Sequence, residues 1–240
     1  MDTIMQKQQL IYEGKAKKVY ATDDDRYCIV AYKDDATAFN GLKKGSIKGK
    51  GSINNRITNH LMKLIAADGI PTHYVEELNE NETIVKKVDI IPLEVIIRNI
   101  AAGSLSKRLG LPEGTVLKKP VLEYCYKNDE LGDPMLNEYH IFAVNIASEQ
   151  DIKLIADYSF RINGILTEYL KNFNIDLIDF KLEYGKTRDG EIILADEISP
   201  DTCRFWDSVS GRKLDKDRFR RDLGEVEEAY AEVLNRLMGE

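Results

Sequence analysis

One strand pair near the C-terminal end constrains the fold of this 240-residue chain most strongly. Residues 176–184 and 191–197 have the alternating or apolar pattern of β-strands. The Asp189-Gly190 dipeptide between them is typical of a tight hairpin turn. The pair therefore predicts an antiparallel sheet in this half of the chain.

The charged residues of this hairpin predict a site. Asp179, Lys181 and Glu183 share one face of the first strand, because side chains alternate along a strand, and the second strand is apolar until Asp196 and Glu197. One interpretation is a solvated face. The other is that a cation lies between the carboxylates, which otherwise repel, as Mg²⁺ does between carboxylates and phosphate oxygens in ATP sites. On this second interpretation Glu183 and Asp196 are metal ligands, and Lys181 is placed to hold an anion.

The remaining pattern predicts strands first and helices later. Residues 148–173 have a helical apolar stripe that begins with a capping box formed by Ser148 and Asp151. Further helices are predicted at 52–68 and 215–238, and further strands at 9–13, 18–22, 27–32, 72–78, 83–88 and 90–97. We therefore expect an α+β protein with antiparallel sheets and two lobes around a cleft. The expected lobes are a strand-rich, nucleotide-covering N-terminal lobe at 1–89 and an α+β lobe at 90–240 that carries the metal and substrate site.

Composition limits the class of protein. The formal net charge is −7, which argues against a dedicated nucleic-acid binder. Cys28, Cys125 and Cys203 have no metal-binding or disulfide-type spacing, which favours a reduced, cytoplasmic compartment and a packing role. The N-terminus is too polar for a signal peptide, and no stretch approaches the roughly 18 apolar residues of a membrane span. We expect a cytoplasmic protein without nucleic-acid or membrane partners.

Two glycine- and lysine-containing segments could contact phosphate. Residues 12–20, YEGKAKKVY, predict a strand–turn–strand in which Lys15, Lys17 and backbone N–H groups can lie along a triphosphate, although a solvated hairpin has the same pattern. Residues 41–51, GLKKGSIKGKG, favour a mobile surface loop, with a lid over substrate as the alternative.

A further phosphate site is predicted around Arg98. This arginine follows an apolar strand, and the AAGS segment after it leads into a helix near Ser104, an arrangement suited to a phosphate monoester. The alternative is that Ser104 only caps the helix and that Arg98 pairs with a surface carboxylate. Arg204 lies in a turn just past Asp196 and can reach the same cleft, whereas Trp206 is expected to pack.

Taken together, these segments resemble the SAICAR synthetase family. The resemblance runs through nearly the whole chain, from YEGKAKKVY through KNDELGDPMLNE and ILADEISPDTCRFWD to LDKDRFRRDLG, and IPLEVIIRN…GS and LIDFKLEYG are similar to the two family signatures. It implies a two-lobed, kinase-like or ATP-grasp-related fold and, for bacterial members, a homodimer. It implies a reaction in which ATP, CAIR and L-aspartate give SAICAR, ADP and phosphate with Mg²⁺.

The resemblance also implies roles for individual residues. They are Gly14, Lys15, Ala16, Lys17 and Lys127 at the phosphates of ATP; Lys86 and Val88 at adenine; Glu183 and Asp196 at the metal; Arg98, Ser104 and Arg204 at the ribonucleotide phosphate; Asp179 and Lys181, as catalytic residues, at the imidazole and its carboxylate; and Asp35 and Lys216 as site residues without an assigned role. The 34–41 segment departs from the family's DxTSAxDG pattern at Ala36, Phe39 and Asn40. The resemblance therefore does not determine the local geometry of a lid there, whereas the implied reaction is unaffected.

The chemistry expected from this assignment has two steps. The carboxylate of CAIR attacks the γ-phosphate to give an acyl phosphate, and the amine of aspartate then displaces phosphate, with positioning and charge neutralisation supplying the rate. Asp179 is one candidate for the general base. Two alternatives are a small-molecule kinase, which would release a stable phosphorylated product, and a nucleotide- or RNA-binding regulator that uses residues 41–51 without turnover.

Overall fold

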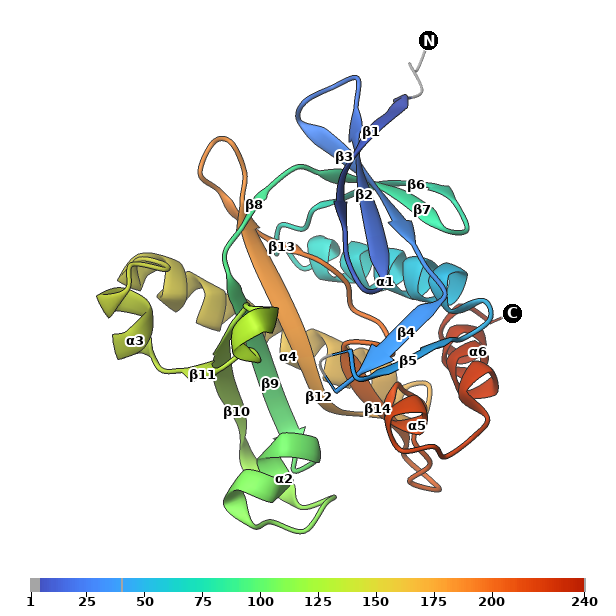
Figure 1. Cartoon of the computed structure of the whole chain (residues 1–240). Coiled ribbons are helices and arrows are strands. Elements are labelled where there is room, and N and C mark those ends of the chain that lie inside the picture. The colour runs from blue at the N-terminus through green and yellow to red at the C-terminus, as the bar shows by residue number, and fades with distance from the viewer. Residues whose placement is uncertain (1–4, 40, 240) are drawn as a thin grey trace.

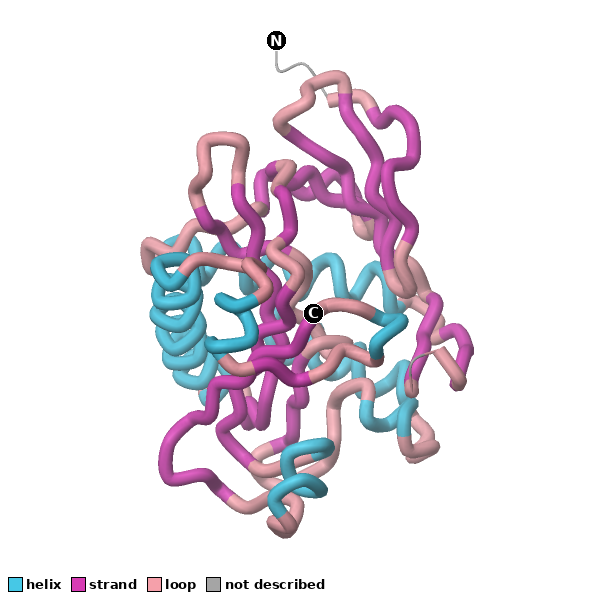
Figure 2. Tube along the Cα trace, turned by 60° about the vertical axis from the view of Figure 1, so that its left-hand side comes forward, coloured by secondary structure: helices cyan, strands magenta, loops and turns pink. Residues whose placement is uncertain are grey.

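The N-terminal third forms an antiparallel sheet. The computed structural model describes residues 5–39 and 41–239, and in both views this sheet lies at the top of the molecule (Figure 1; Figure 2). Cys28, Val30 and Val85 form a small apolar cluster on it. Its strands, in spatial order, are β1 (Lys7–Glu13), β2 (Lys17–Thr22), β3 (Tyr27–Tyr32), β7 (Glu82–Lys86) and β6 (Tyr74–Asn79).

A second antiparallel sheet is built around one long strand. This strand is β12 (Ile175–Lys186), 12 residues in length, and it forms the predicted hairpin with β13 (Ile192–Ala195). It also pairs with β8, β9 and β14. The other members of the sheet are β8 (Asp89–Ile90), β9 (Leu93–Ile100), β10 (Val116–Tyr126), β11 (Met135–Leu136) and β14 (Cys203–Asp207).

Two long helices contribute their apolar faces to one core, α4 from beside β9 and β12 and α1 from beside β3, β6 and β7. The helix α4 (Glu149–Lys171) begins at the predicted capping box, in which Ser148 and Asp151 exchange side chain-to-backbone hydrogen bonds of 3.1 Å. The apolar residues of α1 (Lys50–Ala67) join the same core as those of α4. Three shorter helical segments follow β9 and β10: α2 (Gly103–Leu109), the 3₁₀ turn Asp129–Leu131 and α3 (Glu138–Ala143).

Two predictions about local structure are wrong. The helix predicted at 215–238 is divided into α5 (Asp217–Arg220) and α6 (Val226–Met238), because Asp222, Gly224 and Glu225 have φ of 53°, 69° and 46°, which no right-handed helix accommodates. The segment 41–51 is not a loop throughout. Residues 43–46 form β5 (Lys43–Ser46), which pairs with β4 (Asp35–Ala38), and residues 50 and 51 begin α1.

The predicted α+β class with antiparallel sheets is confirmed, and the three cysteines are buried and unpaired as expected. α1 belongs to the predicted N-terminal lobe and lies beside β3, β6 and β7, yet its residues Ile57, Leu61 and Met62 share one apolar cluster with residues of β9 and β12. The division of the chain into lobes at residue 89 stays a prediction. Within the described residues, no helix combines the length and apolar character needed to span a bilayer.

Candidate functional site

Strand pairing brings three of the predicted site residues into register. Asp179 of β12 lies opposite Arg98 of β9 on one side and opposite Arg204 of β14 on the other. Further along the same strand, Glu183 lies opposite Ala195, the residue before Asp196. β12 therefore carries both an arginine-rich end and a carboxylate-rich end of one site.

At the carboxylate-rich end, lysines lie between the acids. Lys181 Nζ contacts Glu183 and lies 3.3 Å from Asp196 Oδ2, so it is shared by both carboxylates. Lys127 Nζ donates to Glu183 Oε1 at 2.9 Å, and Lys17 contacts Asp196 Oδ1. The structure thus brings together residues from β2, β12 and the segments after β10 and β13.

Two acids in this cluster were not anticipated. Glu94 Oε1 lies 3.4 Å from Lys181 Nζ, and Glu197 Oε1 lies 3.6 Å from Lys17 Nζ. Glu197 follows Asp196 directly, and this adjacency was the available signal. The signal available for Glu94 was its place in the IPLEVIIRN segment, although only strand pairing in three dimensions brings β9 beside β12.

Asp196 and Lys181 stay ionised in this cluster although burial acts against their charged forms. Burial acts against the ionised form of Asp196, but Lys17 and Lys181 outweigh it and hold the pKa of this carboxyl well below its usual range. Burial likewise acts against protonated Lys181, but Glu183 and Asp196 raise its pKa well above the usual value. Burial raises the pKa of Glu197, with Asp196 acting in the same direction. Asp196 and Lys181 are therefore an ionised carboxylate and an ammonium at physiological pH.

The donor set fits a magnesium ion. Glu183 and Asp196 already converge on one cation, Lys181, and both offer the oxygen ligands that Mg²⁺ prefers. Within residues 5–39 and 41–239, no group of three or more His, Cys, Asp or Glu side chains is arranged to hold a metal. In ATP sites Mg²⁺ is usually held by only one or two carboxylates, with substrate phosphates completing its coordination.

At the arginine-rich end, two guanidinium groups flank Asp179. Arg98 Nη1 donates to Asp179 Oδ2 at 2.8 Å, and Arg204 Nη1 donates to the same oxygen at 2.9 Å. Arg98 Nη2 donates to Ser104 Oγ at 3.0 Å, and the N-cap residue of α2 is Ala102 and not Ser104. The alternative in which Ser104 only caps the helix and Arg98 pairs at the surface is wrong, because Arg98 is buried.

Gly103 leaves room for one of these arginines. A Cβ atom on this residue would lie 2.5 Å from Arg204 Nη2, and Gly103 also has a positive φ of 53°. Glycine is therefore required here for both conformation and close approach. Arg204 therefore lies directly against the AAGS segment, residues 101–104.

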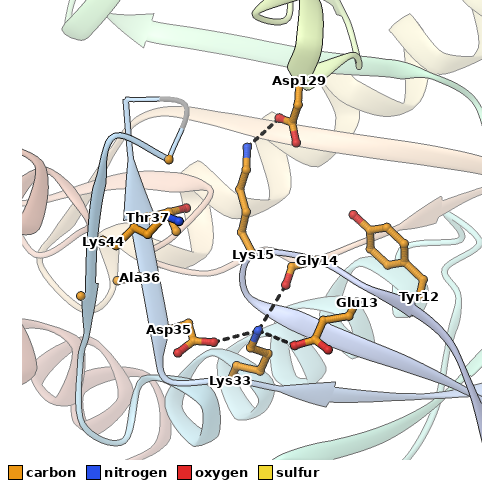
Figure 3. A pocket seen from close by; sticks show the side chains of 12 residues that line it. Tyr12, Glu13, Gly14, Lys15, Lys33, Asp35, Ala36, Thr37, Lys44 and Asp129 are labelled. Atoms are coloured by element: carbon orange, nitrogen blue, oxygen red, sulfur yellow. Dashed lines mark hydrogen bonds and ion pairs between the residues drawn. The ribbon is translucent and has the colours of Figure 1, made fainter.

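The turn between β1 and β2 borders a cavity of about 490 Å³ (Figure 3). Gly14, Lys15 and Asp35 line it, together with residues of the β4–β5 hairpin, and Lys15 Nζ reaches Asp129 at 2.6 Å across the cavity. Ala16 accepts a backbone hydrogen bond from Lys33 at 2.8 Å. Neither Glu183 nor Asp196 lines this cavity.

The predicted adenine-binding residues lie where the chain passes between the sheets. Lys86 N donates to His73 O at 2.7 Å, and Lys87 N donates to Arg26 O at 2.8 Å. Val88 packs on β12, where a Cβ on Gly185 would be only 2.4 Å from its Cγ2 atom. The linker is thus held against the same strand that carries the charged site.

Lys216 belongs to a buried group that sequence reasoning only partly anticipated. Its Nζ lies 3.7 Å from Asp201 Oδ2, which also accepts from Lys50 Nζ at 2.8 Å, while Tyr230 donates to Asp201 Oδ1 at 2.6 Å. Burial lowers the pKa of Lys216, with Asp201 acting against that change. Lys50 was visible in the sequence only as one lysine of a basic, glycine-rich segment.

Comparison with known proteins gives a consistent result. The family described as SAICAR synthetase matches residues 10–237. A phosphoribosylaminoimidazole-succinocarboxamide synthase from Caldanaerobacter subterraneus is 62% identical over 97% of this chain and 99% of its own. The corresponding crystal structure from Ehrlichia chaffeensis is 48% identical and superposes with a TM-score of 0.94 over 95% of this chain and 98% of its own. A SAICAR synthetase in complex with ADP is 51% identical, with a TM-score of 0.94 over 97% and 98% of the two chains.

Proposed function

The chain belongs to the SAICAR synthetase family, and from this premise we propose that the charged residues of β12 and its neighbours are its active site. The protein is an ATP-dependent ligase of purine biosynthesis that joins L-aspartate to the carboxylate of CAIR, giving SAICAR, ADP and phosphate. The observation that carries the site assignment is the convergence of Glu183 and Asp196 on Lys181.

The reaction proceeds in two displacements. An oxygen of the CAIR carboxylate attacks the γ-phosphorus of ATP, and ADP leaves with the electrons of the broken bond. The neutral amine of aspartate then attacks the carbonyl carbon of the acyl phosphate. The bond from this carbon to the phosphate oxygen breaks, phosphate leaves with its electrons, and the nitrogen releases a proton to solvent to give the amide. The site contributes chiefly by alignment and by balancing negative charge, as in other phosphoryl transfers.

The lysines of the cluster hold the reacting anions. Lys181, kept protonated between Glu183 and Asp196, would hold the CAIR carboxylate in line with the γ-phosphate, and Lys17 and Lys127 would contact phosphate oxygens. Glu183 and Asp196 are the residues that would hold Mg²⁺, which would neutralise negative charge on the phosphates of ATP.

The remaining assignments follow the same layout. Lys86 and Val88 would border the adenine. Gly14, Lys15 and Ala16 would lie along the triphosphate, with Asp35 at the edge of the same cavity. Arg98, Ser104 and Arg204 would bind the ribonucleotide 5′-phosphate. Asp179 lies between the arginines, and its catalytic role at the imidazole and its carboxylate stays a prediction. Lys216, which lies beside Asp201, would be a further substrate-binding residue. The working form would be a cytoplasmic homodimer.

Gly103→Ala tests the phosphate assignment. The added Cβ displaces the Arg204 guanidinium, and the KM for CAIR is expected to rise about tenfold, the effect of one weakened charge-assisted hydrogen bond, with the KM for ATP unchanged. Gly110→Ala is the matched control, because Gly110 ends the same helix with a positive φ of 64° and has no atom within 4 Å of the added Cβ. Equal effects of both substitutions on steady-state kinetics would contradict the assignment.

The reaction itself is tested by substrate omission. ADP release is measured with Mg²⁺, ATP, CAIR and aspartate together and with each omitted in turn, while SAICAR is followed by chromatography. ADP should accompany SAICAR one to one only in the full mixture. A stable phosphorylated product formed without aspartate would instead indicate a kinase, and no ADP in any mixture would indicate a binding protein.

A further inference from the structure

Arg98 and Arg204 are held in the same manner, although they come from strands on opposite sides of β12. Each Nε donates to a carboxylate on the outer side of the pair: Arg98 to Glu123 at 2.6 Å and Arg204 to Asp217 at 2.8 Å. Each Nη1 donates to Asp179 in the middle. The two guanidinium groups are therefore fixed from outside and from inside.

The third nitrogen of each group faces one short segment of chain. Arg98 Nη2 donates to Ser104 Oγ at 3.0 Å, and Arg204 Nη2 lies against Gly103, where it leaves no room for a Cβ. The only recorded hydrogen bond of Arg204 Nη2 within the described chain is a long one, 3.4 Å, to Asp217 Oδ1. Both Nη2 atoms therefore lie next to the segment formed by Gly103 and Ser104.

The outer acids are themselves immobilised. Glu123 is 8% exposed and accepts a second hydrogen bond, at 2.5 Å, from Arg108 Nη2 of α2. Asp217 is 3% exposed and accepts one at 2.7 Å from Arg220 Nη1, while its backbone N–H donates to Asp215. Neither side chain can turn away without leaving a buried charge unpaired, which is costly.

We propose that Glu123 and Asp217 are positioning residues that orient Arg98 and Arg204 so that both guanidinium edges meet the 5′-phosphate of the ribonucleotide. This inference rests on the proposed function, which places that phosphate beside Arg98, Ser104 and Arg204. A guanidinium is planar, so holding Nε and Nη1 fixes the direction of the remaining N–H bonds. Small displacements of such a group weaken both binding and alignment.

The test uses the isosteric variants Glu123→Gln and Asp217→Asn. Each is expected to raise the KM for CAIR about 10- to 100-fold, the effect of losing a hydrogen bond to a charged group, with less change in kcat and none in the KM for ATP. The discriminating measurement repeats the assay with the CAIR riboside, which lacks the 5′-phosphate. The loss in kcat/KM caused by either variant should largely disappear with the riboside.

Two sets of controls make the outcome unambiguous. Glu113→Gln removes a carboxylate that pairs with Lys213 and Arg221 and with neither arginine of the pair, and it should alter neither substrate's kinetics. Arg98→Gln and Arg204→Gln report on the phosphate site itself, and if they affect nucleotide and riboside equally, the proposed phosphate site is wrong. If these arginine variants discriminate but Glu123→Gln and Asp217→Asn penalise both substrates alike, or neither, the positioning role alone is overturned.

Discussion

Glu183→Gln and Asp196→Asn should each lower kcat by about three orders of magnitude or more, because a loss of about 4 kcal/mol of transition-state stabilisation corresponds to a thousandfold change in rate. Both variants keep side-chain size but remove the negative charge on which Lys181 and the predicted Mg²⁺ site depend. The measurement is kcat at saturating substrates over a titration of Mg²⁺.

The control for this experiment lies on the same hairpin. Glu191 directly precedes β13 and is exposed to solvent, so Glu191→Gln should leave kcat and its Mg²⁺ dependence unchanged. Circular dichroism and thermal unfolding would establish that Glu183→Gln and Asp196→Asn are folded. Wild-type turnover by either variant at millimolar Mg²⁺ would remove the carboxylate pair from the mechanism.

Asp201→Ala should produce the largest loss of stability, about 3–5 kcal/mol in the free energy of unfolding, the range for breaking a buried ion pair by removing one partner. Lys50 is 1% exposed, and its ammonium donates to Asp201 at 2.8 Å. Without Asp201, Lys50 must carry its charge in a buried environment, and Tyr230 loses the acceptor of its hydroxyl. Urea unfolding monitored by fluorescence measures this difference.

A second substitution separates charge burial from simple loss of packing. The double variant Lys50→Met/Asp201→Ala no longer buries the lone ammonium, so it should be more stable than Asp201→Ala alone. Asp25→Asn is a suitable control, since the Asp25–Arg188 pair is largely exposed and such pairs contribute little. A double variant less stable than Asp201→Ala would show that the cost arises from packing.

The features that sequence reasoning predicted are those set by local pattern. Alternation along β12 placed Asp179, Lys181 and Glu183 on one face, and the capping box located the start of α4. Both depend only on neighbours within a few residues, so periodicity and side-chain chemistry suffice. The resemblance to a family then supplied roles that periodicity could not.

The features that were missed depend on distant contacts or on unusual backbone. Lys50 and Asp201 are 151 residues apart in sequence, and no pattern within either segment indicates the other. The break before α6 requires positive φ at Asp222 and Glu225 as well as at Gly224, and only the glycine signals such a conformation in the sequence. The outer acids of the arginine pair, Glu123 and Asp217, likewise become recognisable only when strand register is known.

The continuity of β12 fixes the distance between the two ends of the site. Asp179 and Glu183 are four residues apart on one uninterrupted strand, which at about 3.4 Å per residue separates the two ends of the site by about 14 Å. Because β8, β9, β13 and β14 all hydrogen-bond to this strand, that separation cannot stretch or shorten. On the proposed assignment, the phosphate and the reacting carboxylate of a substrate must be about this distance apart to reach both ends of the site at once.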